Sequence, residues 1–184
     1  MIRALRLTAS VAALLSLAAC GGKLIDDFDP PEMASFGYSG DATGYFSARG
    51  AVPADGAPWA SAFAGAYRES DGYVVTAYAP TTGTRGNRLV IATSGPVEPG
   101  TYSSDCDGDP ASRCLLAVVA LNMDPGTAGT DPGEIAYVAD HVTFTVDSGL
   151  KEPWLTAHFS GTFVNGGRTL NVSSGNVMLP LLTH

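Results

Sequence analysis

Three aspartates and two cysteines lie together in the stretch DCDGDPASRC, residues 105–114. The carboxylates of Asp105, Asp107 and Asp109 are oxygen ligands of the kind that calcium prefers. An EF-hand loop, however, has Gly at its sixth position and Glu at its twelfth, where this sequence has a proline and a leucine. Cys106 and Cys114 could instead close a disulfide, whereas zinc ligation by them fits no standard spacing. The compartment of the protein decides between these readings.

Two histidines are the candidates for acid–base or metal chemistry. His141 follows Asp140, and His158 lies on the polar side of an alternating segment. If the strands that carry them pair, the two imidazoles and Asp140 would form a small metal or acid–base cluster. The alternative, which we favour, is two half-exposed histidines on a solvated face.

Motifs for catalysis are missing from the sequence. It has no GxSxG nucleophile elbow and no phosphate-binding P-loop. A pair of carboxylates from distant strands, as in glycosidases, would leave no local motif and stays open. We therefore expect no enzymatic activity and no cofactor.

The first twenty residues resemble the signal sequence of bacterial lipoproteins. Two arginines precede an apolar run that ends in Leu17-Ala18-Ala19-Cys20, which is similar to a lipobox at all four positions. The resemblance implies removal of residues 1–19 and lipidation of Cys20, so that acyl chains hold the protein on a membrane. Gly21 in place of Asp implies the outer membrane. A plain cleaved signal with a chance cysteine is the alternative.

In that compartment the remaining cysteines form an even pair. An oxidising envelope favours a Cys106–Cys114 disulfide, which would stabilise the fold by about 2–3 kcal/mol on the chain-entropy model. We then interpret the acidic loop, residues 105–114, as a solvated turn, with calcium binding as the weaker alternative.

The charge of the chain limits its partners. Cleavage after Ala19 would change the formal charge from −8 to −10, because it removes Arg3 and Arg6 and no acid. So acidic a domain is unsuited to nucleic acid, and we expect the lipid to make the membrane contact. An envelope protein or a glycan is the expected partner.

The elements that must position these residues are strands. We expect a flexible tether at 20–35 and one domain at 36–184, folded as an all-β antiparallel sandwich with barrel-like closure as a variant. Residues 142–146 and 154–164 alternate between apolar and polar side chains and predict consecutive antiparallel strands. Asn165-Gly166-Gly167 predicts a hairpin to a last strand that breaks near Gly175.

Three further segments are apolar on both sides. Residues 73–79, 89–92 and 115–121 predict central strands that are covered on both faces. The segment 58–69 fits a strand or a helix, and its glycine and the following Asp-Gly turn favour the strand.

A second resemblance covers most of the domain. Three motifs, in this order, are similar to those of a group of uncharacterised bacterial lipoproteins: Asp55-Gly56-Ala57-Pro58-Trp59-Ala60, Pro99-Gly100-Thr101-Tyr102 and Phe159-Ser160-Gly161-Thr162-Phe163. The resemblance implies a small β-sandwich and no assigned activity. The sequence therefore favours an anchored binding or accessory module. A structural subunit that adds an edge strand to a neighbour, and an envelope hydrolase with an unrecognised site, are the rivals.

Overall fold

The computed structural model describes residues 33–53, 61–106, 112–125, 133–147 and 153–182. Strands make up 72% of these residues, which include no helix and hence none that could cross a membrane. The all-β prediction is confirmed. The ten strands are β1 (Met33–Gly40), β2 (Gly44–Ala48), β3 (Phe63–Glu69), β4 (Gly72–Pro80), β5 (Gly86–Ser94), β6 (Gly100–Ser103), β7 (Cys114–Met123), β8 (Ile135–Val146), β9 (Trp154–Asn165) and β10 (Arg168–Leu182).

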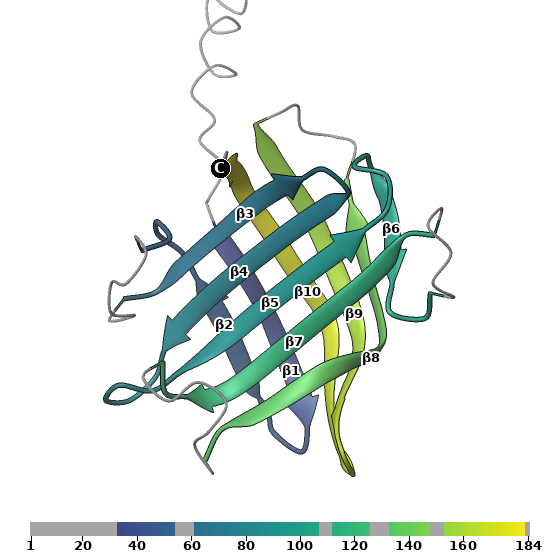
Figure 1. The fold of residues 1–184 in the computed structure, drawn as a ribbon. Coiled ribbons are helices and arrows are strands. Elements are labelled where there is room, and N and C mark those ends of the chain that lie inside the picture. Colours follow the sequence, from purple (N-terminus) through teal and green to yellow (C-terminus); the bar gives the residue numbers. More distant parts are fainter. Residues whose placement is uncertain (1–32, 54–60, 107–111, 126–132, 148–152, 183–184) are drawn as a thin grey trace, which may run out of the picture. The chain divides into compact units, whose positions relative to one another are not determined.

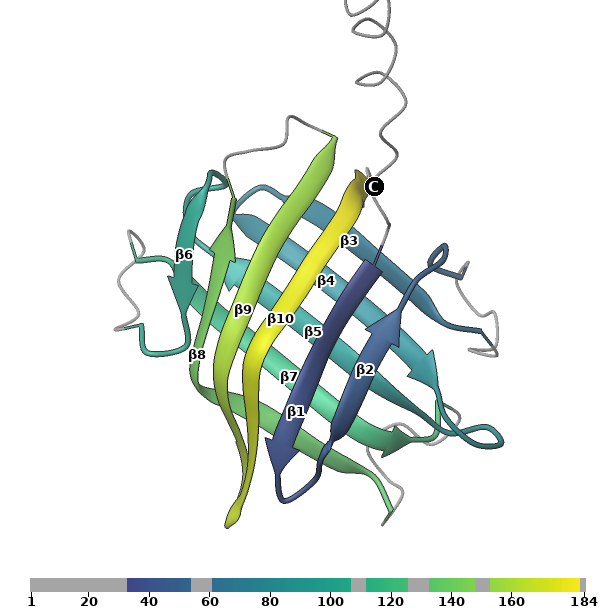
Figure 2. The ribbon, with the colours of Figure 1, turned by 180° about the vertical axis from the view of Figure 1, so that it is seen from behind.

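All ten strands belong to one sheet that curls back on itself. In Figure 1 the layer toward the viewer contains β3, β4, β5 and β7, and Figure 2 shows the other layer, with β1, β2, β9 and β10. β8 joins the two layers because it pairs with β7 and with β9. The ring closes where the end of β10 pairs in parallel with β3, at Leu181↔Ala66 and Leu182↔Tyr67.

The predicted strands are present, and two of them are longer than expected. β8 and β9 pair antiparallel and the hairpin to β10 turns at Gly166, as predicted. The ambiguous segment is a strand over its described part, β3. β8 begins at Ile135, seven residues before the predicted 142–146, and β1 begins at Met33, inside the predicted tether. Cys20 and Trp59 lie outside the described residues.

A bulge in β8 directs the chain from one layer to the other. The register with β9 shifts between Ala139 and His141. Ser104 compensates for the broken ladder, because its hydroxyl accepts from the amide of Val142 and donates to the carbonyl of Asp140, both at 2.8 Å. Gly161 lies opposite the bulge with φ +143°, and a Cβ there would meet the carbonyl oxygen of His141 at 2.0 Å. Only glycine fits this position.

The core fills the space between the two layers. Alternate residues of each strand point inward, so that a strand contributes a side chain every second position. Phe36 lies against Phe46 and Phe159, with ring centroids 4.8 and 5.5 Å apart. The other large buried side chains include Tyr102, Tyr137, Phe144, Phe163, Leu89, Ile91 and Leu155.

The prediction that β4, β5 and β7 are covered on both faces is wrong at Leu116, although Ala120 at the other end of β7 is buried. Their inward residues, such as Leu89 and Val119, are fully buried, but Leu116 of β7 is 60% exposed. A closed sheet covers only its inner face, whereas the prediction assumed layers on both sides. The outer face of these strands is therefore apolar, and around Leu116 the described chain leaves it uncovered.

Candidate functional site

The outer surface of β4, β5, β7 and β8 carries aliphatic side chains in register. Val90, Val118 and Val138 are direct partners in a row across β5, β7 and β8. Direct partners share one face of a sheet, and the next outward row contains Ala92 and Leu116. Val138 is 42% exposed and Leu116 60%. We call the set Val74, Val90, Ala92, Leu116, Val118 and Val138 the outer apolar face.

One end of this outer surface is covered by the chain itself. Phe63 and Tyr78 stack at 5.9 Å between ring centroids and, with Ala120 and Met123, form a small buried cluster outside the sheet. Val52, which follows β2, packs against this cluster. The other end, around Leu116 and Val138, has no such cover among the described residues.

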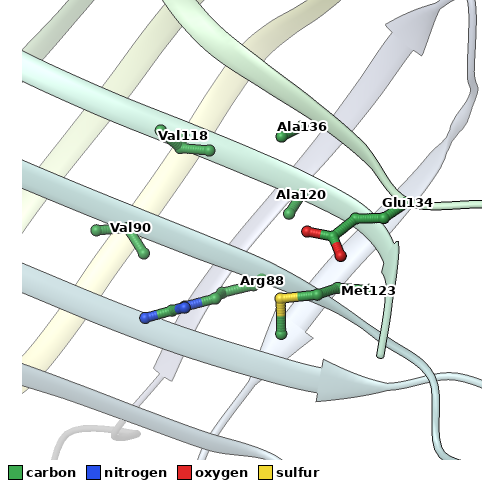
Figure 3. A pocket seen from close by; sticks show the side chains of 7 residues that line it. All are labelled: Arg88, Val90, Val118, Ala120, Met123, Glu134 and Ala136. Carbon is green, nitrogen blue, oxygen red and sulfur yellow. The ribbon is translucent and has the colours of Figure 1, made fainter. Parts of the chain in front are cut away.

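A hollow of about 330 Å³ lies between the covered and the uncovered end. The hollow arises because two small residues, Ala120 and Ala136, are direct partners at its floor and leave space above them. Figure 3 shows the hollow with its seven lining residues: Arg88, Val90, Val118, Ala120, Met123, Glu134 and Ala136. Its size is at the lower limit of ligand pockets, which measure about 300–1,000 Å³, and it is also large enough for a single protruding side chain.

Two opposite charges border the hollow. In Figure 3 the guanidinium of Arg88 and the carboxylate of Glu134 lie on different sides of it. Burial lowers the pKa of Arg88, and the nearby Glu134 carboxylate acts in the opposite direction. Because an arginine pKa lies far above neutrality, Arg88 keeps its charge. The floor of the hollow is thus apolar, and the opposite charges of Arg88 and Glu134 at its sides cancel.

The cysteine pair forms the predicted disulfide. The sulfurs of Cys106 and Cys114 are 2.20 Å apart and the Cα atoms 5.2 Å, a separation typical of disulfides. The bond ties the segment after β6 to the first residue of β7. Asp107 and Asp109 lie outside the described residues.

The histidine cluster that we considered as the less favoured alternative does not form. β8 and β9 pair as expected, but His141 lies opposite Thr162 and His158 opposite Thr145. The two histidines are therefore about four residues, or roughly 13 Å, apart along the strands. His158 Nδ1 instead lies 3.3 Å from a carboxylate oxygen of Asp147.

The contacts of His141 are unsuited to holding a metal. Its Nδ1 lies 2.8 Å from Asp105 and its Nε2 3.7 Å from Asp140, so that the two carboxylates face opposite nitrogens of the ring. They cannot converge on one ion together with a single ring nitrogen. Within the described ranges no group of three or more His, Cys, Asp or Glu side chains could hold a metal. Both histidines are exposed, as the favoured reading predicted.

The opposite layer has a polar exterior. Thr145, His158 and Asn176 form one outward row across β8, β9 and β10, and Thr162 and Asn171 form another. Thr162 donates to the amide oxygen of Asn171 at 3.2 Å. We call these five residues the polar outer face. It is the solvated side that an alternating strand predicts.

Arg88 and the outer apolar face were not recognised from the sequence, and Glu134 was considered only as one candidate for a glycosidase-like carboxylate pair. The signal for the outer apolar face was the run of apolar residues in β4, β5 and β7, which also fits strands covered on both faces. Searches of protein-family models, curated proteins and solved structures found no match to this chain. Any functional conclusion therefore rests on the residues and geometry described above.

Proposed function

We propose that this chain is a membrane-anchored lipoprotein of the cell envelope that acts as a binding or accessory module through its outer apolar face. One observation carries the proposal: Leu116 and Val138 are exposed on an aliphatic face beside a hollow. Contiguous apolar surface of this kind marks sites of association, because burying a Leu or Val side chain contributes about 1.5–3 kcal/mol.

The anchor is proposed from the sequence. Acyl chains on Cys20 would hold the domain at the outer membrane, and residues 21–32 would separate the two. A partner confined to the same envelope can then bind with low affinity and still occupy the outer apolar face, since confinement raises the effective concentration of the partner. We propose an envelope protein as the partner, because an aliphatic surface suits protein side chains better than the hydroxyls of a glycan.

A second candidate function is that of a structural subunit in an envelope assembly. β2 stands at the end of the strand order and, of the described strands, it pairs only with β1. Such an edge can accept a strand from a neighbouring protein. Tyr45 of β2 is 65% exposed and would lie beside an added strand.

The decisive experiment is crosslinking of the tagged full chain in bacterial cells, followed by identification of what it captures. Leu116→Glu should lower capture at least tenfold, because it places a charge in the contact. Thr162→Glu on the polar outer face is the matched control and should leave capture unchanged. Equal capture by both variants would refute a role for the outer apolar face. Retention of Cys20→Ser on membranes would refute the anchor separately.

A further inference from the structure

The outer apolar face has a protruding side chain and part of the hollow on the same strand, β7. Leu116, Val118 and Ala120 are alternate residues of β7 and point to the same side. Leu116 protrudes into solvent, whereas Ala120 forms part of the floor of the hollow. Each lies about 6.7 Å from Val118 along the strand, in opposite directions.

This spacing makes the face complementary to itself. Consider a two-fold axis that lies in the plane of contact and follows the row Val90–Val118–Val138. Each valine of the row then meets its own copy, and Leu116 of one copy lies over Ala120 of the other. The same rotation brings Ala92, the β5 partner of Leu116, over Arg88, the β5 partner of Ala120. Large side chains thus meet small ones at both positions, as a self-complementary interface requires.

Charge supports the same arrangement. The whole chain has a formal charge of −8, so two copies repel each other over most of their surfaces. The hollow, in contrast, has one cation and one anion, Arg88 and Glu134, at its sides. The charges that line the hollow therefore sum to zero, so two copies can bind through this face although each copy as a whole is acidic.

The size of the face sets the strength of the contact. Four strands span about 14 Å across, and the distance from Leu116 to Ala120 is about 13 Å, so each copy contributes about 200 Å². Stable interfaces bury about 800 Å² per partner. We therefore expect a weak dimer, which forms efficiently where anchoring confines the copies to one membrane.

We infer that the outer apolar face binds the same face of a second copy of this chain, with Leu116 of each copy inserted in the hollow of the other. The inference rests on the proposed function, since it names the partner of that same face. Facing sheets are about 10 Å apart, and the two Val118 residues would be directly opposite each other.

The test uses Val118→Cys in the full chain, expressed in bacterial cells with two different tags and treated with a bismaleimide that spans about 10 Å. We expect a covalent species of twice the mass of the single tagged chain that contains both tags. Asn171→Cys, on the polar outer face, is the matched control and should give at least tenfold less. Adding Leu116→Glu to Val118→Cys should remove the species, whereas adding Thr162→Glu should not. Protection of Cys106 and Cys114 from alkylation verifies that each variant is folded.

Three results would count against the inference. Crosslinking of Val118→Cys to itself no stronger than that of Asn171→Cys would overturn it. An adduct with a different protein would overturn it and support the proposed function. The absence of any adduct at Val118 would overturn both. The unmodified chain reports on the anchor separately, because maleimide labelling of Cys20 would show that its thiol is free.

Discussion

Replacing Gly161 by alanine should destabilise the fold more than any other single methyl group added to the β9–β10 hairpin. The residue has φ +143°, and its new Cβ would lie 2.0 Å from the His141 carbonyl oxygen and 2.6 Å from Cα of Val142. A backbone conformation that side chains avoid costs about 1–3 kcal/mol. Displacing the packed bulge costs about 1–3 kcal/mol more. Alanine recovers about 0.4–1 kcal/mol by restricting the unfolded chain.

The net loss is about 2–5 kcal/mol out of a total stability of about 5–15 kcal/mol. Urea unfolding, followed by tryptophan fluorescence, measures it as a fall of about 1–2.5 M in the midpoint, given a slope of about 2 kcal/mol per M. Gly167→Ala is the matched control in the same hairpin. No atom lies within 4 Å of a Cβ at Gly167, and its φ is not positive, so the midpoint should barely change. Equal midpoints for the two variants would refute the reasoning about the bulge.

Three other perturbations have expected outcomes. Cys114→Ser should lower the free energy of unfolding by about 2.5 kcal/mol, the chain-entropy value for a loop of this length, measured by urea unfolding against the oxidised wild type. Ser104→Ala should lower the free energy of unfolding by about 1–3 kcal/mol, because it leaves backbone groups of the β8 bulge without their partner. The urea midpoint of the variant is compared with that of the wild type. Burial, and then neighbouring Tyr73, raises the pKa of Tyr102, so its contribution to stability is complete below about pH 10 and is lost as pH rises through its folded-state value. Absorbance at 295 nm should show a late titration step that Tyr102→Phe removes.

The sequence predicts a strand well where one face of the strand meets water. β9 alternates cleanly because Phe159 and Phe163 point into the core while His158 and Thr162 point outward to solvent. The first half of β8 escaped prediction for the opposite reason. The bulge after Ala139 interrupts the alternation, and it depends on Ser104, a residue of a distant segment.

The candidate site was less predictable than the fold. An apolar run such as that of β7 shows that both faces are apolar but not that both are covered. Whether Leu116 is exposed depends on how the sheet closes, and closure depends on the pairing of β10 with β3, more than a hundred residues apart. The two histidines lie apart because the register of β8 with β9 places His141 opposite Thr162 and His158 opposite Thr145, and the sequence does not fix that register.

The pairing of β1 with β10 also has a consequence for export. β10, residues 168–182, completes the sheet: it pairs with β1, β9 and β3. A chain that crosses a membrane with its amino end first therefore emerges without β10, whose pairing with β3 closes the ring. Contacts over so long a sequence separation also form slowly. Under the export that we propose, the chain would therefore stay unfolded during translocation until β10 has been delivered, after which one closing step assembles both layers together.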